Sequence, residues 1–348
     1  MKILVIRRDN IGDLILTTPL ISALSRHFGG KVDVLVNTYN QSVLENNPHI
    51  GTVHLYSKLH HRQHGQSALG VILHRIKTSL SIRRTRYDVA IVAKEHWDKR
   101  PLQWAKLSGA KRIIAIGDNT PAMVTDPVTV PAGQQHIVEL LSALAAPLGV
   151  SQPPRGLELY PRDSEIAALR QRLHPGDELP VYGIQISARK LSQRWPAEKF
   201  IDFMHNIATR HPCRFLLFWS PGSADNKAHP GDDEKAQQIQ QACGDIALTA
   251  VHTSGLRELI AGMSLCQQIL TSDGGALHVA AGVNVPTVAM FGDSDAWFWG
   301  PWGVPAEVIE APNRDVSQLS AELVAQRFMA LRQQVLSSQE AAPDSAVA

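Results

Sequence analysis

Short apolar runs alternate with longer amphipathic stretches along the chain. The runs of the first half are apolar almost throughout and lie at residues 2–7, 32–37, 53–56, 88–93 and 112–117. Continuous apolar runs of this length are typical of strands buried on both faces of a parallel sheet. Residues 17–28 and 68–84, which lie between such runs, have helical spacing of apolar positions. Strand, helix and strand in repetition predict a doubly wound α/β sheet.

The second half repeats this alternation after an interruption. Residues 146–163 hold four prolines and two glycines without a helical period, which predicts a linker. Strands are then expected at 181–186, 214–219, 267–272 and 286–292, and helices at 197–211 and 256–265. The pattern predicts two Rossmann-like domains that face a cleft. Their expected bounds are 1–155 and 165–316, followed by a helix at 317–335 and a disordered tail at 336–348.

Composition narrows the class of protein. The 348 residues are 44% hydrophobic, which supplies enough core for two domains. Lys+Arg 34 against Asp+Glu 32 gives no field that favours nucleic acid. Three scattered cysteines indicate neither a disulfide framework nor a metal site. With no signal peptide and no apolar run of about 18 residues, the sequence predicts a soluble protein of the reduced cytosol.

The candidate functional residues lie in four loops. Ligands of open parallel sheets bind beyond the carboxyl ends of the strands. This rule selects the loops at 7–13, 94–98, 187–195 and 272–278. In the first loop Asp13 stands between an apolar strand and an apolar helix. Its carboxylate can cap the helix, hold a ligand or accept a proton, and the residue pattern leaves all three open.

The stretch TSDGGALHVAAG (271–282) predicts an anion site. Asp273 is expected at the N-cap of a helix that Gly274 and Gly275 open, with His278 one turn later. Free backbone N–H groups and the helix dipole attract phosphate, and glycines allow a close approach. The alternative is an aspartate cap with glycines that serve packing.

A basic loop precedes it in the same half. Ser187, Arg189, Lys190, Gln193 and Arg194 lie together after a predicted strand. Three cations beside a phosphate-binding helix could neutralise a leaving diphosphate without a metal. An ordinary solvated basic loop is the alternative. The following Trp195 is expected to pack and anchor the loop.

Three stretches together resemble glycosyltransferase family 9, the heptosyltransferases of lipopolysaccharide core assembly. They are RRDNIGDLILTTPL, SARKLSQRWP and TSDGGALHVAAG with the PTVAMFGDSD and WGPWG that follow it. They occur in the family's order, and the resemblance covers about residues 1–335. It implies a GT-B fold and a cytosolic enzyme at the inner membrane face. It also implies an ADP-heptose donor and metal-free inversion at the anomeric carbon.

The resemblance assigns roles to particular positions. Gly12 and Asp13 match the family's Gly-Asp pair, in which the aspartate is the proposed base. Asp273, Gly274, Gly275 and His278 match its donor motif, although Gly274 stands where a hydroxyl residue is usual. Gln193 stands where several members carry lysine, and Lys190 or Arg194 is expected to supply that charge. The acid that binds the ribose cannot be aligned, and its candidates are Asp232, Asp233 and Glu234.

The acceptor is expected to bind the first domain. Residues 57–66 and 83–86 are rich in Lys, His and Arg. In a heptosyltransferase-like protein the loop after the third strand faces a phosphorylated acceptor, which Lys58, His60, His61 and Arg62 suit. Lys94, with Glu95 and His96, follows the fourth strand and is expected to point into the cleft. A metal is not expected on the histidines, since no acidic or cysteine partner lies nearby in the sequence.

The resemblance therefore predicts inverting transfer of heptose from ADP-heptose to a lipopolysaccharide inner-core acceptor, with Asp13 as base. The enzyme would touch the inner membrane through its acceptor, and it would need no cofactor or metal. Other nucleotide sugars, a protein or O-antigen acceptor, and a non-catalytic nucleotide-sugar-binding subunit remain alternatives. An NAD-dependent enzyme is disfavoured because RRDNIGD lacks the G-x-G-x-x-G pattern.

Overall fold

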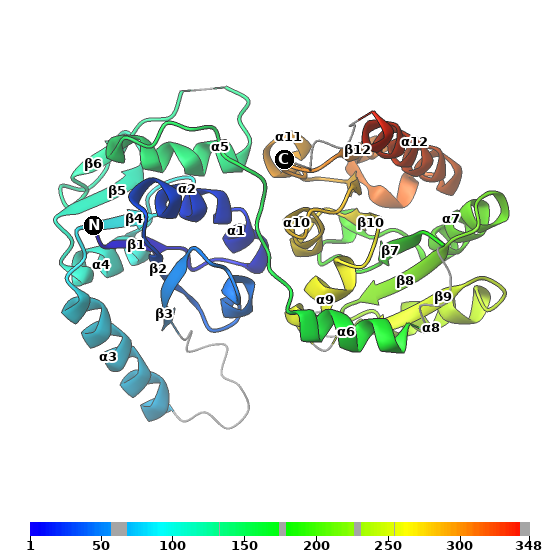
Figure 1. Cartoon of the computed structure of the whole chain (residues 1–348), viewed down its shortest axis with the longest axis horizontal. Helices are drawn as coiled ribbons and strands as arrows, with labels where there is room; N and C mark the ends of the chain where they lie inside the picture. Colours follow the sequence, from blue (N-terminus) through cyan, green and yellow to red (C-terminus); the bar gives the residue numbers. More distant parts are fainter. Residues whose placement is uncertain (57–67, 132, 174–178, 226–230, 254, 342–348) are drawn as a thin grey trace, which may run out of the picture. The chain divides into compact units, whose positions relative to one another are not determined.

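The computed structural model describes residues 1–56, 68–131, 133–173, 179–225, 231–253 and 255–341 (Figure 1). The chain divides into two compact units, Met1–Tyr160 and Pro161–Ala348. The division falls inside the proline-rich segment 146–163. In the part of the chain that the structure describes, no helix is both long and apolar enough to cross a bilayer.

Unit 1 is built on a six-stranded parallel sheet, counted over its described residues, in the order β3-β2-β1-β4-β5-β6. Its strands are β1 Ile3–Ile6, β2 Val32–Asn37, β3 Ile50–Tyr56, β4 Val89–Val92, β5 Arg112–Ile116 and β6 Asp126–Val128. Its α-helices are α1 Ile11–Ile15, α2 Thr18–Phe28, α3 Ala68–Thr85, α4 Lys99–Ser108 and α5 Ile137–Ser142. Short 3-10 helices lie at Gln41–Leu44 and Ala143–Leu148.

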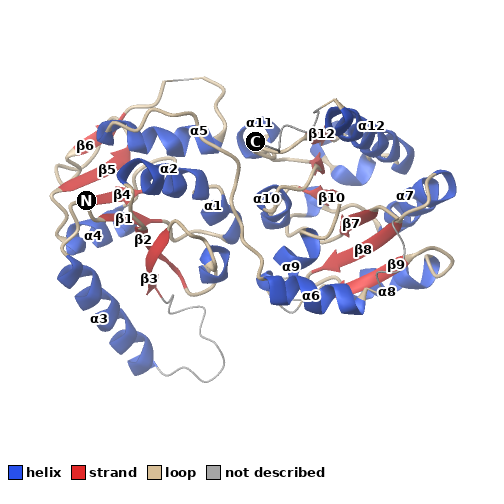
Figure 2. Ribbon diagram, viewed as in Figure 1, coloured by secondary structure: helices blue, strands red, loops and turns tan. Residues whose placement is uncertain are grey.

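Unit 2 repeats the plan, with the described strands in the order β12-β11-β10-β7-β8-β9, all parallel (Figure 2). The strands are β7 Val181–Gln185, β8 Arg214–Trp219, β9 Leu248–His252, β10 Gln268–Ser272, β11 Thr287–Phe291 and β12 Ala306–Glu310. The α-helices are α6 Asp163–Arg172, α7 Ala197–Arg210, α8 Asp233–Ala242, α9 Leu256–Met263, α10 Gly275–Gly282, α11 Ala296–Trp299 and α12 Ala321–Glu340. Further 3-10 turns lie at Leu191–Gln193, Pro312–Arg314 and Val316–Gln318.

The central strands are buried on both faces, as their apolar runs predict. All four residues of β1 are buried. Leu4 and Ile6 belong to a core cluster with Ile82 of α3 and Leu102 of α4. Because side chains alternate across a strand, Val5 faces the opposite side of the sheet. The doubly wound α/β class expected from the sequence is confirmed.

Three strands were not expected, and each lies at or next to a sheet edge. Pro127 is the middle residue of the three-residue strand β6, and of β12 only Ile309 is buried. Most of β9 is only partly buried. Edge strands need no continuous apolar run, since one side of their ladder is open.

The C-terminal helix differs from its expected bounds. The tail was expected to be disordered from residue 336, but α12 continues to Glu340 and begins at Ala321. Ser320 caps its first turn by accepting a hydrogen bond from Leu323 N at 3.2 Å. Val335, the last residue of the expected helix, packs in the core of unit 2, and α12 continues for five residues beyond it.

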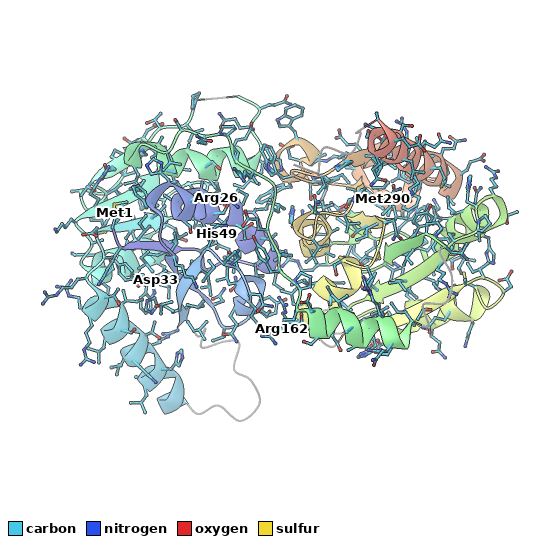
Figure 3. The ribbon with its side chains drawn as sticks, in the orientation of Figure 1. Met1, Arg26, Asp33, His49, Arg162 and Met290 are labelled. Atoms are coloured by element: carbon cyan, nitrogen blue, oxygen red, sulfur yellow. The ribbon has the colours of Figure 1, made fainter. Side chains whose placement is uncertain are left out.

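Ion pairs fix the chain on both sides of the unit boundary. Arg26 of α2 donates to Glu158 at 2.8 Å, and His49 Nε2 lies 3.8 Å from the same carboxylate (Figure 3). The pair ties the end of unit 1 to its own body. In unit 2, Arg257 of α9 holds Glu165 of α6 at 2.6 Å. Glu158 therefore fixes the proline-rich segment to unit 1, and Glu165, two residues after the segment, fixes the chain to unit 2.

Candidate active site

The strand orders place the candidate loops at the reversal point of each sheet. In unit 1 the order reverses between β1 and β4, and in unit 2 between β7 and β10. Beyond the carboxyl ends of such a strand pair lies the crevice where α/β proteins bind ligands. The loops that follow these four strands are the loops selected from the sequence. The topology thus gives each unit one candidate half-site.

A buried arginine organises the half-site of unit 1. The side chain of Arg7 is 1% exposed and lies 3.1 Å from Asp13 Oδ1. It also lies 3.4 Å from Asp9 Oδ2 and 3.5 Å from Glu95 Oε2, and it donates to the Ala93 carbonyl. One permanent cation therefore connects the loop after β1 with the loop after β4. The sequence analysis missed Arg7, although an arginine directly after a buried strand was a signal.

Asp13 both caps a helix and faces this cation. Its Oδ2 accepts hydrogen bonds from Asn10 N at 2.8 Å and from Asn10 Nδ2 at 3.0 Å, which forms a capping box. Asp13 is thus the third residue of α1, which ends at Ile15 before α2 begins, while Gly12 is buried in the same short helix. Its side chain remains 15% exposed. Each carboxylate oxygen has a second lone pair, so capping does not prevent it from accepting a proton.

Two asparagines fix the loop that carries Asp13. Asn37 at the end of β2 donates to the carbonyls of Arg8 and Asp9. Asn40 donates to the Asp9 carbonyl at 3.3 Å. Both side chains are buried. The loop is therefore held from the neighbouring strand, a contribution that the sequence analysis did not identify.

The expected acceptor residues are only partly described. Lys94 Nζ lies 3.5 Å from Asp9 Oδ1 and 3.3 Å from Asp98 Oδ2, and its side chain is 13% exposed. Lys94 therefore belongs to the same charged network as Arg7 and Asp13. The other expected residues, Lys58, His60, His61 and Arg62, lie outside the described residues.

In unit 2 the helix of the anion site begins one residue later than expected. The N-cap of α10 is Gly274, with φ +154°, and not Asp273. That φ lies in a region that is open almost only to glycine. Gly274 and Gly275 are both exposed, so backbone at the helix N-terminus is accessible to an anion. His278, by contrast, is buried within the helix.

Gln193 joins the loops around this helix. Its side chain is buried, and its Nε2 lies 3.0 Å from Ser294 Oγ and 3.4 Å from Asp273 Oδ2. Its Oε1 accepts a hydrogen bond from Gly292 N at 2.9 Å. The amide thus connects three loops, and its expected contact with the donor stays a prediction. Burial raises the pKa of Asp273, which Lys190 opposes.

The cations of the basic loop differ in their surroundings. Lys190 is half exposed, with Nζ 3.2 Å from Asp293 Oδ1. Arg194 donates from Nε to the Ala188 carbonyl at 2.9 Å, and Ser187 Oγ accepts from Ser220 N at 2.8 Å. Lys190 and the neighbouring Arg189 are therefore both exposed cations of this loop. Trp195 is 1% exposed, and its indole N–H donates to the Leu319 carbonyl at 3.0 Å, which confirms its packing role.

The three candidate ribose-binding acids are distinguished by their partners. Asp233 is exposed and accepts hydrogen bonds from Trp219 Nε1 at 2.7 Å and from Gly222 N at 2.9 Å, one on each carboxylate oxygen. Glu234 is exposed. Asp232 is buried, and its Oδ2 has no hydrogen-bond partner among the described residues. Asp233 and Glu234 are thus exposed, whereas the unpaired oxygen of Asp232 is enclosed by protein.

The described residues hold no cluster of metal ligands, and two of their cysteine thiols are kept protonated by burial. No group of three or more His, Cys, Asp or Glu side chains among them is placed to hold a metal ion. Burial raises the pKa of both the Cys213 and the Cys243 thiol to about 11. Buried thiols of this kind are poor nucleophiles because they stay protonated.

Comparison with known proteins identifies first the fold and then the family. An Escherichia coli heptosyltransferase solved with ADP superposes with a TM-score of 0.76 over 95% of this chain and 100% of that chain, at 18% identity. The chain thus has the GT-B glycosyltransferase fold. Residues 75–327 match the model of glycosyltransferase family 9 (heptosyltransferase), and the chain belongs to that family. The resemblance drawn from the three motifs is confirmed.

Two characterised relatives cover most of the chain. Lipopolysaccharide heptosyltransferase 3 of Escherichia coli is 27% identical over 84% of this chain and 83% of that protein. Lipopolysaccharide heptosyltransferase 2 of Salmonella typhimurium is 26% identical over 89% of this chain and 88% of that protein. These likenesses, together with the family, support a glycosyltransferase.

A fourth cation near the basic loop gives a pH-dependent prediction. Lys235 Nζ donates to the Ile186 carbonyl at 2.8 Å, and burial lowers the pKa of this ammonium to about 8. Between about pH 8 and pH 10.5, Lys235 is therefore protonated in the unfolded chain and deprotonated in the folded chain. We expect the free energy of unfolding, relative to that of Lys235→Met, to rise over this range by up to about 3 kcal/mol.

Urea denaturation of both proteins at pH 7.5 and pH 10.5 measures this difference. Other titrating groups are shared by the two proteins and cancel. The hydrogen bond to Ile186 is lost in the variant at both pH values and changes only the offset. A difference that stays constant with pH contradicts the prediction.

Proposed function

We propose that the protein is an inverting, metal-independent glycosyltransferase that moves heptose from ADP-heptose to a lipopolysaccharide inner-core acceptor. Family membership and relatives named as lipopolysaccharide heptosyltransferases support this proposal. The observation that carries the mechanism is the carboxylate of Asp13, which Arg7 holds at the reversal point of the sheet of unit 1. A fixed, partly exposed carboxylate in that position suits a general base.

The reaction needs one base and an activated leaving group. The acceptor hydroxyl gives its proton to Asp13 while its oxygen attacks the anomeric carbon. The bond from that carbon to the diphosphate oxygen breaks on the opposite face, so the configuration inverts and ADP leaves. Asp13 then releases its proton to water. The charge that develops on the diphosphate is stabilised by backbone N–H groups at the start of α10 and by Lys190 and Arg194.

The donor's nucleotide is proposed to lie across the reversal point of unit 2. Gly274 and Gly275 leave the backbone accessible to the diphosphate, and His278 and Ser187 complete the set expected from the family motifs. Asp232, Asp233 and Glu234, at the start of α8, are the proposed candidates to bind the ribose hydroxyls. Gln193 and Asp273 position these groups.

The acceptor is proposed to bind unit 1. Lys94, together with Lys58, His60, His61 and Arg62, supplies positive charge that suits phosphate or carboxylate groups of an inner core. Such an acceptor is anchored in lipid, so the enzyme works at the cytoplasmic face of the inner membrane. It needs neither a nucleic acid nor a cofactor.

One assay tests the reaction directly. Purified protein is incubated with ADP-heptose and a panel of truncated core acceptors, and the products are measured by mass. Growth of one acceptor by a single heptose, with the anomeric configuration inverted by NMR, is the expected result. Transfer that occurs only with another nucleotide sugar would show that the donor is not ADP-heptose. Binding of nucleotide without any turnover would instead support a non-catalytic subunit.

We predict that ADP stabilises the fold more than UDP or GDP, and that EDTA does not abolish turnover. The phosphate site consists of a helix N-terminus and cations, so no metal is required to hold the diphosphate. At a hundredfold excess over Kd, ADP should add about 2.7 kcal/mol to the free energy of unfolding. Thermal denaturation with each nucleotide in turn ranks the affinities for ADP, UDP and GDP.

A matched pair of variants localises the nucleotide. Lys190→Ala should weaken ADP binding by about tenfold, the value of one charge-assisted contact. Arg172→Ala, at an exposed position of α6, should leave ADP binding unchanged.

Turnover that is lost in EDTA and restored by Mg²⁺ or Mn²⁺ would overturn the metal-independent mechanism.

A further inference from the structure

Helix α3 of unit 1 exposes an apolar stripe. Its members are Ile72, Leu73, Ile76 and Leu80, which are 49%, 63%, 50% and 49% exposed. At about 100° per residue, these four side chains fall within an arc of about 100° on the helix. The buried positions Thr78 and Ile82 lie roughly opposite. The stripe therefore points away from the face by which α3 packs on its own unit, and Figure 1 shows α3 extending beyond the sheet of unit 1.

Positive charge borders this stripe, and helix α3 itself contains no acidic residue. Lys77 and Arg84 line the same open surface groove as Leu73, Ile76 and Leu80. Residues 68–86 contain no Asp or Glu. Basic residues in the last turn suit the helix dipole, but Lys77 lies in the middle of the helix and gains nothing from it. The dipole alone therefore does not account for the charge pattern.

We propose that α3 lies in the interface of an anionic phospholipid bilayer. The apolar stripe would enter the boundary between head groups and acyl chains, while Lys77 and Arg84 meet lipid phosphates. A helix with one apolar face, flanking cations and no acidic residue has the chemistry that such an interface binds. Contiguous exposed apolar side chains rimmed by polar residues mark sites of interaction with a membrane or a protein.

A second copy of the chain fits the stripe less well. If two α3 helices paired through their stripes, Lys77 and Arg84 of each would approach the same cations of the other with no acidic residue in α3 to compensate. Like charges across an interface disfavour pairing. An anionic lipid surface removes this repulsion and attracts the cations.

The proposal goes beyond the proposed function, because the contact is with lipid itself and needs neither donor nor acceptor. Vesicles that contain no lipopolysaccharide therefore test it separately. Failure of the proposed glycosyl transfer would leave lipid binding in place, and failure of lipid binding would leave turnover of a soluble acceptor in place.

The experiment is flotation of the full chain with extruded vesicles in about 0.1 M salt. Vesicles of phosphatidylcholine alone are compared with vesicles that also contain phosphatidylglycerol. The wild-type protein should bind the anionic vesicles at least about tenfold more strongly than the neutral ones. The triple variant Leu73→Gln/Ile76→Gln/Leu80→Gln should lose about tenfold or more on the anionic vesicles. Glutamine preserves helix propensity, and the replaced side chains are exposed, so the fold should be retained.

Two further variants separate the causes. Lys77→Gln/Arg84→Gln should reduce the preference for anionic vesicles and keep the weak binding to neutral ones. Leu323→Gln/Leu336→Gln in α12 removes two exposed leucines from unit 2 and should change nothing. Equal melting temperatures and equal turnover of a soluble acceptor show that each variant is folded.

Three results would overturn the proposal. The first is a wild-type protein that does not float with anionic vesicles. The second is an α3 triple variant that binds them as the wild type does. The third is a stripe that serves self-association, seen in sedimentation equilibrium as a dimer that the triple variant converts to a monomer while vesicle binding is absent.

Discussion

Replacing Asp13 with asparagine is expected to lower kcat by 10²–10⁴-fold, roughly 3 to 5 kcal/mol of barrier. Asparagine keeps the shape of the side chain and an oxygen that can accept from Asn10, so the capping box is largely preserved. It cannot take the proton of the acceptor hydroxyl. Steady-state kinetics with a saturating acceptor measure the loss, and thermal shift measures ADP affinity, which should hold because the proposed diphosphate site is in unit 2.

The same variant should also lose some stability, which a simple cap would not predict. Arg7 loses one of three carboxylate partners, and the other two, Asp9 and Glu95, remain. We expect a loss of about 1.5–3 kcal/mol in the free energy of unfolding, the range for a hydrogen bond to a charged group. Stability loss without loss of kcat would reduce Asp13 to a structural residue.

Asp126→Asn is the matched control. It removes the partner of Arg112, an ion pair of β5 and β6 in the same unit, whose arginine is 40% exposed. An exposed pair contributes about 0–1 kcal/mol, and kcat should stay within about twofold of the wild type. If Asp126→Asn reduces kcat as strongly as Asp13→Asn, the loss at Asp13 reflects destabilisation and not proton transfer.

The second large effect is expected from Arg7→Met. Methionine fills much of the volume but leaves three carboxylates without the guanidinium that they share, and only Asp9 among them keeps its contact with Lys94. Asp9 Oδ2 and Glu95 Oε2 are buried and have no hydrogen-bond partner among the described residues, so the ion pair with Arg7 compensates their charge. Breaking such a buried pair typically costs about 3–5 kcal/mol. At about 2–4 °C per kcal/mol for a unit of this size, the melting temperature should fall by roughly 10 °C.

Urea denaturation of the free protein measures this loss, and kcat should fall with it because Asp13 loses its support. Arg112→Met, at the partly exposed pair with Asp126, should cost no more than about 1 kcal/mol and leave kcat unchanged. Equal costs for the two methionine variants would show that the Arg7 network is solvated and contributes little. Arg7→Lys distinguishes charge from geometry, since lysine restores the charge but not the branched guanidinium.

Much of this protein follows from the sequence alone. Strands buried in a parallel sheet are apolar on both faces, so apolar runs such as 2–7 and 214–219 predict buried strands. The alternation with helices then determines a doubly wound sheet, and the rule for ligand sites selects the loops after its strands. For that reason Asp13, Lys190 and the Gly274–Gly275 pair could be proposed before any coordinates existed.

The tertiary structure decided which side chains meet in those loops. Arg7 and Glu95 are 88 positions apart in the sequence, and only the pairing of β1 with β4 brings them together. Gln193 and Asp273 come from loops after different strands, and only burial shows that their contact is internal. The one-residue shift of the N-cap to Gly274 depends on a backbone angle that no composition rule supplies.

The physical reason is the range of the forces. The spacing of apolar residues within one short segment indicates which positions of that segment are buried, so it can be recognised without knowledge of distant residues. Ion pairs and side-chain hydrogen bonds depend on distances of about 3–4 Å between residues that the sequence separates widely, and strand order sets those distances. The sequence therefore determined the two sheets and the loops that carry the chemistry. The packing of those sheets determined that a buried arginine holds the proposed base, and that an apolar stripe on α3 remains exposed.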